Sequence, residues 1–443
     1  MIFHLRDYVL HPLAIKRFHD LLGESQYWSP ERRRGWVQER LDRTLRHAVR
    51  NVPYYRKTLG PYESDFNEMV DRLDISPLPS ITKEIVRNNF RELCAENLND
   101  YGPVPTQTSG STGTPTKFFL DRESNITQFA SIWRVLNWSG YRFGDRFADL
   151  TGFLPKDDRL FRYDLQLNCL HLSSFNFKKE NMPLYAQRLK RFKPVLIKAY
   201  PSALELFCRW LRELGLDDYR PPSVLTAAET LLEHQKAIIQ DVLRCPVFDF
   251  YNQNERAALF STCEEETYHV HEEYSFAEIL DRSTNGNESG GTGEVVGTTF
   301  HNQAMPLIRY RTNDLAEKVE RPCGCGRTYG AVRNIIGRIE DVVITPDGRH
   351  VGRLDAAFKA SPGVRLSQIV QDTVDAVDVR IVKGVSFQQS DVDKIEDGLR
   401  ARLGNEIGIR FAFVDSIPAG TNGKIQFVIS KPGRELASMT NDR

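Results

Sequence analysis

The fold class is decided by residues 195–251, which open with Val195-Leu196-Ile197 and close with Val247-Phe248-Asp249-Phe250-Tyr251. Three further segments lie between these two runs: a helical pattern at Ala203–Leu214, the β-prone run Ser223-Val224-Leu225-Thr226-Ala227, and a helical pattern at 232–243. Short β-prone runs that alternate with helices indicate strand–helix–strand units and a parallel sheet. Ligands of open parallel sheets bind beyond the carboxyl ends of the strands. We therefore predict an α/β core with its ligand site at those ends.

The character of the chain changes on both sides of this core. Residues 1–100 are predicted to be a helical part that packs on the large domain, with amphipathic helices at 31–58, ended by Pro53, and at 82–95, capped by Thr82. The α/β pattern is assigned to 101–337. A small α+β domain is predicted at 338–443, with the elements Val377–Val382, Val392–Leu403 and Ile409–Val414.

Composition excludes several classes of protein. Lys plus Arg and Asp plus Glu both number 59, and this balance argues against a broad surface for nucleic acid or anionic membranes. No stretch approaches the ~20 apolar residues of a transmembrane helix, and Met1–Asp7 carries charges of both signs where a signal peptide is apolar. The seven cysteines show no disulfide framework. A reducing, cytoplasmic setting is expected.

The run Thr108-Ser109-Gly110-Ser111-Thr112-Gly113-Thr114 is a candidate phosphate loop. Glycines let the backbone approach a phosphate closely, and small hydroxyls donate hydrogen bonds to it. The run is not a Walker A loop, because Pro115-Thr116 separate its last glycine from Lys117. A flexible linker has the same composition. The β-prone Phe118-Phe119-Leu120 that follows favours a hairpin over a linker.

The run 108–116 resembles the phosphate loop of the adenylate-forming enzymes, the acyl-CoA synthetases and their relatives. Other segments resemble further motifs of that superfamily in the same order: Ala227-Ala228-Glu229, Tyr251–Glu255, Arg309–Asp314, Gly337–Asp341 and Gly423-Lys424. The opening segment Leu45–Tyr55 is similar to the phenylacetate–CoA ligase branch and its CapK-like relatives. The resemblance implies a large ATP-binding domain with β-sheets flanked by helices, and a small mobile C-terminal domain that rotates about Arg338–Asp341.

The same resemblance implies a function and a role for each matched residue. The chain is expected to activate a carboxylic acid with ATP and Mg²⁺, releasing pyrophosphate, and then to transfer the acyl group. Lys424 and Glu255 are the catalytic candidates, with Glu255 holding magnesium. The nucleotide-binding candidates are Thr108, Ser109, Gly110, Ser111, Thr112, Gly113, Thr114, Ala228, Glu229, Asp249, Tyr251, Asn252, Asp314 and Arg338.

Two positions depart from the superfamily's pattern, and the acyl acceptor is left open. Glu340 stands where the hinge usually has Asp or Lys, and Asn252 stands where Gly usually follows the tyrosine. CoA is the default acceptor, and an amine, giving an amide, is the alternative. A non-catalytic nucleotide-binding scaffold and a homodimer also stay open. The expected partners are small molecules, with no nucleic acid and no transmembrane segment.

A tetrahedral zinc site is the remaining candidate. Cys323 and Cys325 lie in a turn-rich segment, and Cys263 with His269 precede them by about sixty residues. The spacing fits buried cysteines equally well, and His271 is the alternative nitrogen ligand. Some members of the phenylacetate–CoA ligase branch carry a similar pattern, which favours zinc. Four protein ligands would make the metal structural.

Overall fold

The computed structural model describes residues 11–107, 116–151, 159–174, 178–281, 291–319, 323–338, 342–347, 350–351, 354–358, 361, 363–419 and 425–439. The chain forms two compact units, each built from two stretches of sequence. The first comprises residues 1–138 and 250–335, and the second comprises residues 139–249 and 336–443. The chain crosses between them within strands β8 (Val247–Asn252) and β14 (Ala331–Arg338).

The first unit has a helical part. Its helices are α2 (Pro12–Ser25), α3 (Pro30–Asn51), α4 (Pro53–Thr58), α5 (Phe66–Arg72), α6 (Lys83–Asn88) and α7 (Arg122–Trp138), with 3₁₀ turns at Gly60–Asp65 and Leu98–Tyr101. Helix α3 begins where the Ser29 side chain accepts from the Arg32 N–H, and it ends just before Pro53 as predicted; Pro53 then begins the short helix α4, so the range predicted at 31–58 holds two helices. The apolar stripe Val37, Leu41, Leu45 and Ala48 is buried in the core of this unit.

The helix predicted at 82–95 is shorter in the structure. Thr82 caps its start as expected, accepting from the Ile85 N–H at 3.2 Å. The helix ends at Asn88: the Asn89 N–H still bonds the Ile85 carbonyl at 2.9 Å, but the backbone of Asn89, at φ −115° and ψ 26°, leaves the helical conformation. The sequence prediction was therefore right about the start of this helix and wrong about its length.

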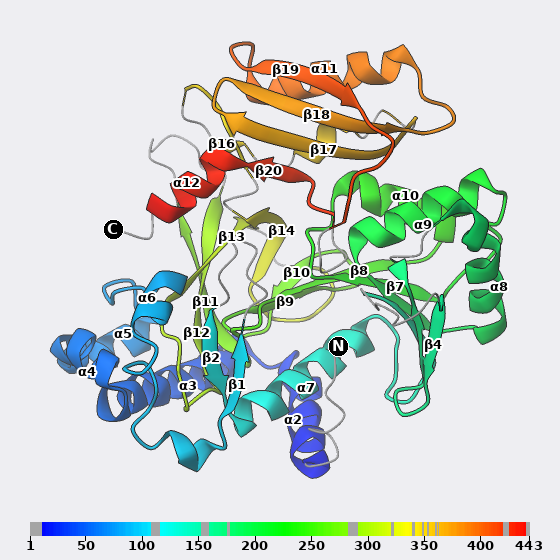
Figure 1. Ribbon diagram of the computed structural model, residues 1–443. Helices are drawn as coiled ribbons and strands as arrows, with labels where there is room; N and C mark the ends of the chain where they lie inside the picture. Colours follow the sequence, from blue (N-terminus) through cyan, green and yellow to red (C-terminus); the bar gives the residue numbers. More distant parts are fainter. Residues whose placement is uncertain are drawn as a thin grey trace. The chain divides into compact units, whose positions relative to one another are not determined.

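The strands of the first unit form a hairpin and a mainly antiparallel sheet (Figure 1). The hairpin pairs β1 (Val104–Gln107) with β2 (Lys117–Leu120). The sheet has the order β11-β12-β13-β14-β10-β9-β8. Its further strands are β9 (Leu259–Thr262), β10 (Tyr268–Val270), β11 (Ser275–Asp281), β12 (Thr292–Thr299) and β13 (Tyr310–Lys318).

The second unit contains the predicted parallel sheet, in the order β8-β7-β6-β3-β5-β4. Strands β3 (Phe147–Leu150), β5 (Cys169–Leu172), β6 (Leu196–Ala199) and β7 (Ser223–Ala227) pair in parallel, and β4 (Phe161–Asp164) is an antiparallel edge. Helices α8 (Met182–Phe192), α9 (Pro201–Glu213) and α10 (Glu233–Leu243) supply apolar residues to the core over this sheet. A 3₁₀ turn at Lys179–Asn181 precedes α8. The predicted strands and helices of 195–251 are confirmed within two residues at each end.

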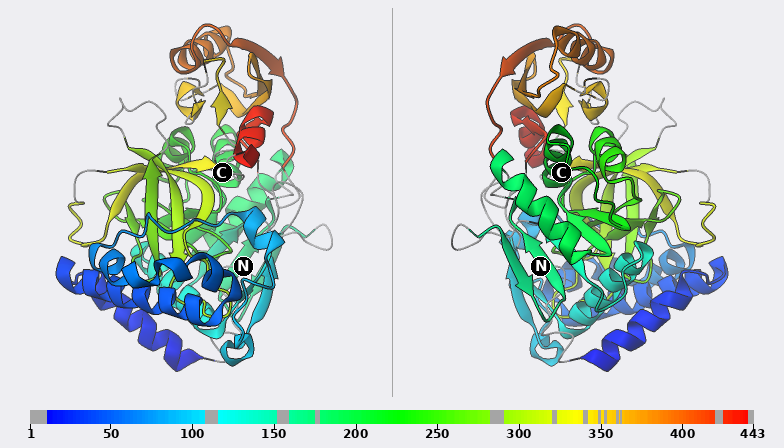
Figure 2. Two further views of the ribbon diagram at one scale, coloured as in Figure 1. Left: turned by 90° about the vertical axis from the view of Figure 1, so that its left-hand side faces the viewer. Right: turned by 90° about the vertical axis from the view of Figure 1, so that its right-hand side faces the viewer.

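The C-terminal residues form a four-stranded sheet in the order β19-β18-β17-β20. In Figures 1 and 2 the orange helix α11 covers one face of this sheet, and its Ile395, Leu399 and Leu403 pack in the same core as Ile369 and Val379. The elements are β15 (Val343–Ile344), β16 (His350–Val351), a 3₁₀ turn at Leu354–Phe358, β17 (Val364–Thr373), β18 (Ala376–Lys383), α11 (Gln389–Leu403), β19 (Gly408–Phe413), β20 (Val428–Ser430) and α12 (Lys431–Met439). The predicted fold class, an α/β protein with a small α+β part at its C-terminus, is confirmed. The three domain boundaries drawn from the sequence stay a prediction.

Among the helices that the structure describes, none combines the length and the apolar character required to cross a bilayer.

Leu41→Ala tests the core of the first unit. The Leu41 side chain is fully buried, so its truncation should cost about 2–5 kcal/mol through lost burial and a residual cavity. Leu13→Ala on α2 is the control, because Leu13 is 83% exposed and its loss should change stability by less than about 0.5 kcal/mol. Urea unfolding followed by tryptophan fluorescence measures both, and equal effects of the two substitutions would contradict the assignment of the α3 stripe to the core.

Candidate functional site

The strands that flank the candidate phosphate loop pair with each other. Val104 lies opposite Leu120, and Gln107 lies opposite Lys117, so residues 108–116 connect two antiparallel strands. The hairpin predicted from Phe118-Phe119-Leu120 is therefore confirmed. The loop candidates Thr108 to Thr114 themselves lie outside the described residues, as do Glu340 and Lys424.

In the first unit, two tyrosines hold the two acidic candidates. The hydroxyl of Tyr251, at the end of β8, donates to the Asp314 carboxylate at 2.6 Å. The hydroxyl of Tyr310, at the start of β13, donates to Glu255 at 2.7 Å. Glu255 is buried and Asp314 is half-buried. Burial of a carboxylate without a hydrogen-bond donor beside it is strongly unfavourable, so each depends on its tyrosine. The structure thus gathers Tyr251, Glu255 and Asp314 around Tyr310, a residue to which the sequence analysis gave no separate role.

The charges in this cluster act on the two hydroxyls. Burial raises the pKa of Tyr251 well above its usual value, and the neighbouring Asp314 carboxylate raises it further. Burial likewise raises the pKa of Tyr310, with Glu255 and then Asp314 adding to the effect. Both phenols therefore stay protonated and keep donating to the carboxylates at neutral pH. The resulting arrangement offers two oriented carboxylates, suited to a hard cation and to sugar hydroxyls.

Asn252 makes no special turn in this structure. It is the last residue of β8 and pairs with Leu259 of β9 in the ordinary antiparallel register. The left-handed residue of this segment is Arg256, at φ +58°, whose guanidinium binds Ser124 and Asn125 of α7. Asn in place of Gly therefore requires no left-handed backbone here.

The remaining nucleotide candidates lie in the second unit, in loops beyond its strands. Ala228 follows β7 with φ +67° and is exposed, and Glu229 beside it accepts from the backbone N–H and the hydroxyl of Ser202, both at 3.0 Å. These bonds tie the loop after β7 to the start of α9, which follows β6. Asp249, buried in β8, accepts from the Thr226 hydroxyl at 2.5 Å. Ser202 is a partner that the motifs did not indicate.

Arg338 follows a glycine that lies against the same loop. Gly337 has φ +117°, a region that L side chains rarely adopt, and a Cβ there would stand 3.1 Å from the Thr230 hydroxyl. The half-buried Arg338 at the end of β14 is therefore placed next to the loop that carries Ala228 and Glu229. The sequence order alone could not show this proximity, since about a hundred residues separate the two segments.

The four predicted zinc ligands converge in the first unit. The ligand atoms of Cys263, His269, Cys323 and Cys325 all lie within 4.8 Å of one another. Cys263 Sγ is 3.6 Å from Cys323 Sγ, and Cys325 Sγ is 3.3 Å from His269 Nε2. Ligands on a tetrahedron with Zn–S near 2.3 Å stand roughly 3.5–3.8 Å apart, so the donor set and spacing fit zinc.

The environment of this cluster favours the ligand forms of His269 and Cys323, whereas burial raises the pKa of the Cys263 thiol to about 12. Burial lowers the pKa of His269 to about 4, and the Arg327 cation adds to this, so the imidazole is neutral at pH 7. Burial raises the pKa of the Cys323 thiol, but hydrogen bonds from the Cys325 backbone and from neighbouring side chains more than offset it, leaving that pKa below its usual value. Neutral imidazole and thiolate are the forms that bind zinc.

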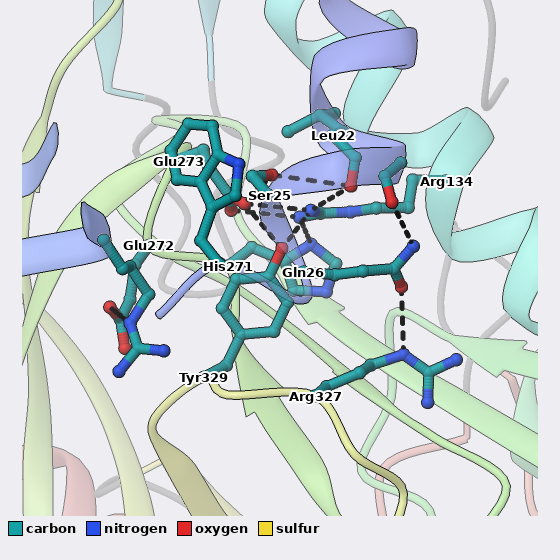
Figure 3. A network of polar contacts seen from close by, with 12 residues as sticks. Leu22, Ser25, Gln26, Arg134, His271, Glu272, Glu273, Arg327 and Tyr329 are labelled. Carbon is teal, nitrogen blue, oxygen red and sulfur yellow. Dashed lines mark hydrogen bonds and ion pairs between the residues drawn. The ribbon is translucent and has the colours of Figure 1, made fainter. Parts of the chain in front are cut away.

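His271, the alternative ligand, is committed elsewhere (Figure 3). Its Nδ1 lies 2.5 Å from the Arg134 guanidinium, and its Nε2 lies 2.7 Å from the Ser261 hydroxyl. Arg134 also pairs with Glu273 at 3.3 Å and donates to the Tyr329 hydroxyl at 2.5 Å. This network joins helices α2 and α7 to the strand and loop that carry His269 and Cys325. Sequence reasoning missed it because its members are far apart along the chain.

The chain is similar to known proteins over most of its length. Residues 343–431 match the family model described as the CapK C-terminal domain. Protein CapK of Staphylococcus aureus is 25% identical over 403 residues, which cover 88% of each chain. Phenylacetate-coenzyme A ligase of Escherichia coli K12 is 28% identical over 326 residues, covering 69% of this chain and 71% of the relative. The chain is a homologue of CapK and of the phenylacetate-coenzyme A ligases.

Solved structures share the fold of this CapK and ligase homologue. A 2-hydroxyisobutyryl-CoA ligase in the postadenylation state matches with a TM-score of 0.69 at 18% identity, covering 95% of this chain and 96% of that one. An anthranilate CoA ligase in complex with anthranoyl-AMP matches with a TM-score of 0.52 at 15% identity, covering 75% and 66%. The fold is therefore that of the adenylate-forming ligases.

Arg134→Met tests the network around the Cys and His cluster. Arg134 and Glu273 side chains are 3% and 1% exposed, so removal of one partner leaves the other charge buried and should destabilise the protein by about 3–5 kcal/mol. Arg410→Met is the matched control, because the Arg410–Asp378 pair is exposed and should contribute less than about 1 kcal/mol. Thermal or urea unfolding measures the difference; a loss no larger than in the control would show that the buried pair is dispensable.

Proposed function

We propose that this protein is an AMP-forming carboxylate ligase. A carboxylate oxygen of the acid attacks the α-phosphorus of ATP, pyrophosphate leaves, and the acyl group of the adenylate passes to the thiol of CoA with release of AMP. The homology to phenylacetate-coenzyme A ligases supports the reaction class. The observation that carries it is the gathering of Tyr251, Glu255 and Asp314 around Tyr310, in the order and spacing of the superfamily's motifs.

The residue roles follow from this arrangement and from the resemblance. We assign Glu255 to Mg²⁺ and Asp314, with Arg338, to the ribose hydroxyls. Ala228, Glu229, Asp249, Tyr251 and Asn252 are assigned to the adenine side, and residues 108–114 to the phosphates. Lys424 is assigned to the charge that develops between the carboxylate and the α-phosphate, where a fixed cation is most effective. Rotation of the C-terminal domain about residues 338–341 is part of the same proposal.

An amine is the second candidate acceptor. The C-terminal residues 343–431 match the CapK C-terminal model, whereas the alignments with the phenylacetate-coenzyme A ligases cover about 70% of the chain. Supplying CoA or a panel of amines to the adenylate-loaded enzyme, and weighing the product, separates a thioester from an amide. We place the enzyme in the reducing cytoplasm, and its oligomeric state is to be measured in the same preparation.

Lys424→Ala should reduce ATP–pyrophosphate exchange by at least about 100-fold while ATP binding changes little, because the lysine acts on charge that appears in the transition state. Lys431→Ala, at an exposed position on α12, is the control and should keep its activity. Exchange with a panel of acids and isothermal titration with ATP measure the two quantities. Exchange at the unaltered rate in Lys424→Ala would refute the lysine assignment; ATP binding without exchange for any acid would favour the scaffold.

Zinc is proposed to hold the loop 323–327 against β9 and β10 through Cys263, His269, Cys323 and Cys325. The protein purified without chelator should contain about one zinc per chain, and Cys325→Ser should lose it together with several degrees of thermal stability. Cys94→Ser is the control, because Cys94 is half-buried in the helical part and its Sγ bonds only locally, to the Phe90 carbonyl. Elemental analysis checks the metal; zinc retained at full stoichiometry in Cys325→Ser would contradict the ligand set.

A further inference from the structure

A row of charged and polar side chains crosses the parallel sheet of the second unit. Asp149 of β3 lies in register with His171 of β5 on one side and with Lys198 of β6 on the other. Asp149 Oδ1 is 3.8 Å from Lys198 Nζ, and its Oδ2 is 3.7 Å from His171 Nδ1. All three side chains are buried. The sequence pattern did not connect the three.

The row occupies the face of the sheet opposite the apolar core. Neighbouring residues of the same strands, Ala148, Leu150, Leu170, Leu172, Ile197 and Ala199, belong to the core that α8, α9 and α10 share. Successive side chains of a strand point to opposite faces, so Asp149, His171 and Lys198 all point to the other one. Each stands one residue before the end of its strand. The row is thus at the carboxyl edge of the sheet, where open α/β sheets bind their ligands.

The hydrogen-bonding capacity of the row exceeds what the described residues use. Among the residues that the structure describes, Lys198 uses one of its three N–H donors, toward the Thr151 hydroxyl at 3.2 Å. That hydroxyl and the Thr151 N–H donate to Oδ1 of Asp149, at 2.5 and 2.9 Å, so two donors of Lys198 and Oδ2 of Asp149 are left for a ligand. The hydroxyl of Ser173, fully buried and two residues beyond His171, has no hydrogen-bond partner among those residues. Buried polar groups are nearly always satisfied, so donors left over at this edge indicate a polar ligand.

Charge compensation keeps the row close to neutral. Burial raises the pKa of Asp149, but Lys198, the Thr151 hydrogen bond and His171 more than offset it, so that pKa lies below its usual value and the carboxyl is ionised. Burial lowers the pKa of Lys198, and Asp149 counteracts this. Burial also lowers the pKa of His171, which keeps the imidazole neutral at pH 7. The row therefore pairs one ammonium with one carboxylate beside a neutral ring.

A metal ion suits this row poorly, although Asp149, Cys169 and His171 bring three ligand atoms within 4.8 Å of one another. The Lys198 ammonium stands beside the carboxylate that a cation would need. Burial raises the pKa of the Cys169 thiol far above its usual value, so the thiolate that binds metals is strongly disfavoured. An organic group that both donates and accepts hydrogen bonds fits the pair better.

The row lies beside the loops assigned to the nucleotide. Lys198 is on β6, which is followed by Ser202, and Ser202 holds Glu229 of the loop after β7 through two hydrogen bonds. Adjacent strands are about 4.8 Å apart, so Asp149, two strands from β7, is roughly 10 Å from the adenine-side loop across the sheet. That span corresponds to an acyl group a few bonds long attached to an adenylate.

We propose, resting on the ligase function above, that Asp149 and Lys198 bind a hydroxyl group carried by the acid, so that the substrate is a hydroxylated carboxylic acid. A hydroxyl donates to the carboxylate and accepts from the ammonium, and it adds no charge to a neutral row. A second carboxylate would stand beside Asp149 and repel it at short range. A hydrocarbon chain would leave the donors of Lys198 unsatisfied in a buried site.

The test is ATP–pyrophosphate exchange with matched acids that differ in one group. Phenylacetate is compared with its ring-hydroxylated derivatives, and hexanoate with its hydroxylated derivatives and with adipate. A hexuronic acid is also tested. At least one hydroxylated acid should exceed its deoxy analogue in kcat/KM by about 100-fold or more, since sites built around a substrate hydroxyl reject analogues that lack it. Lys198→Met should remove most of that preference. Asp149→Asn, an isosteric change, should do the same if the methionine variant folds poorly.

The outcomes separate this inference from the function on which it rests. A preference for the deoxy acids or for adipate, or an unchanged preference in both variants, overturns the hydroxyl assignment while the ligase function stands. No exchange with any acid overturns the ligase function and this inference together. Lys190→Met is the control, because Lys190 pairs with Asp218 at the surface of α8 and should keep both rate and preference. A purely structural row would lower the rates for hydroxylated and deoxy acids by the same factor.

Discussion

The parallel pairing of β3, β5, β6 and β7 is the constraint on which the second unit depends. Parallel strands place all their carboxyl ends at one edge, so each connection must return along the sheet; helices do so between β5, β6 and β7, and strand β4 does so between β3 and β5. The row Asp149–His171–Lys198, the loop after β6 and the loop after β7 therefore lie at the same edge, although about eighty residues separate Asp149 from Glu229. Helices α8, α9 and α10 cover the face of the sheet opposite the row.

Buried charge is the second recurring feature, and in each case the protein compensates it locally. In the first unit, Arg134 and Glu273 form a buried ion pair, and Ser25 and Tyr329 complete its hydrogen bonds. A single unpaired charge at this position would cost several kcal/mol. Burial raises the pKa of Glu205 of α9, but His234 and then Arg209 more than offset this and lower it to about 2, and Gln235 of α10 donates a further hydrogen bond to the carboxylate. The pair of Lys198 and Asp149 differs from these two in one respect: the donors of Lys198 are not used up by the described residues around it.

The sequence predicted what depends on local pattern. The alternation at 195–251 gave the strands and helices of the parallel sheet, and Thr82 and Pro53 marked helix ends, because capping and proline act within a few residues. The ordered motifs placed Tyr251, Glu255 and Asp314 in one site, and the resemblance placed Cys263 and His269 with Cys323 and Cys325. Tyr310 as the partner of Glu255, Ser202 as the partner of Glu229, and the Arg134 network could not be predicted, because each joins segments whose proximity only the folded chain creates. The length of α6 was missed because the backbone of Asn89 leaves the helical conformation, which the apolar pattern of 82–95 does not show.

The two crossings of the chain within β8 and β14 affect how the protein is made. Residues 1–138 belong to the same unit as strands β9 to β14 and cannot pack against them until those strands have been synthesised. At roughly 5–20 residues per second this delay is on the order of 10–40 s. During that interval the apolar stripe of α3 has no sheet to cover it. Neither unit is a contiguous stretch of the gene. A truncation before residue 336 leaves every residue of the first unit in place but removes part of the second, whereas a truncation at the N-terminus removes part of the first.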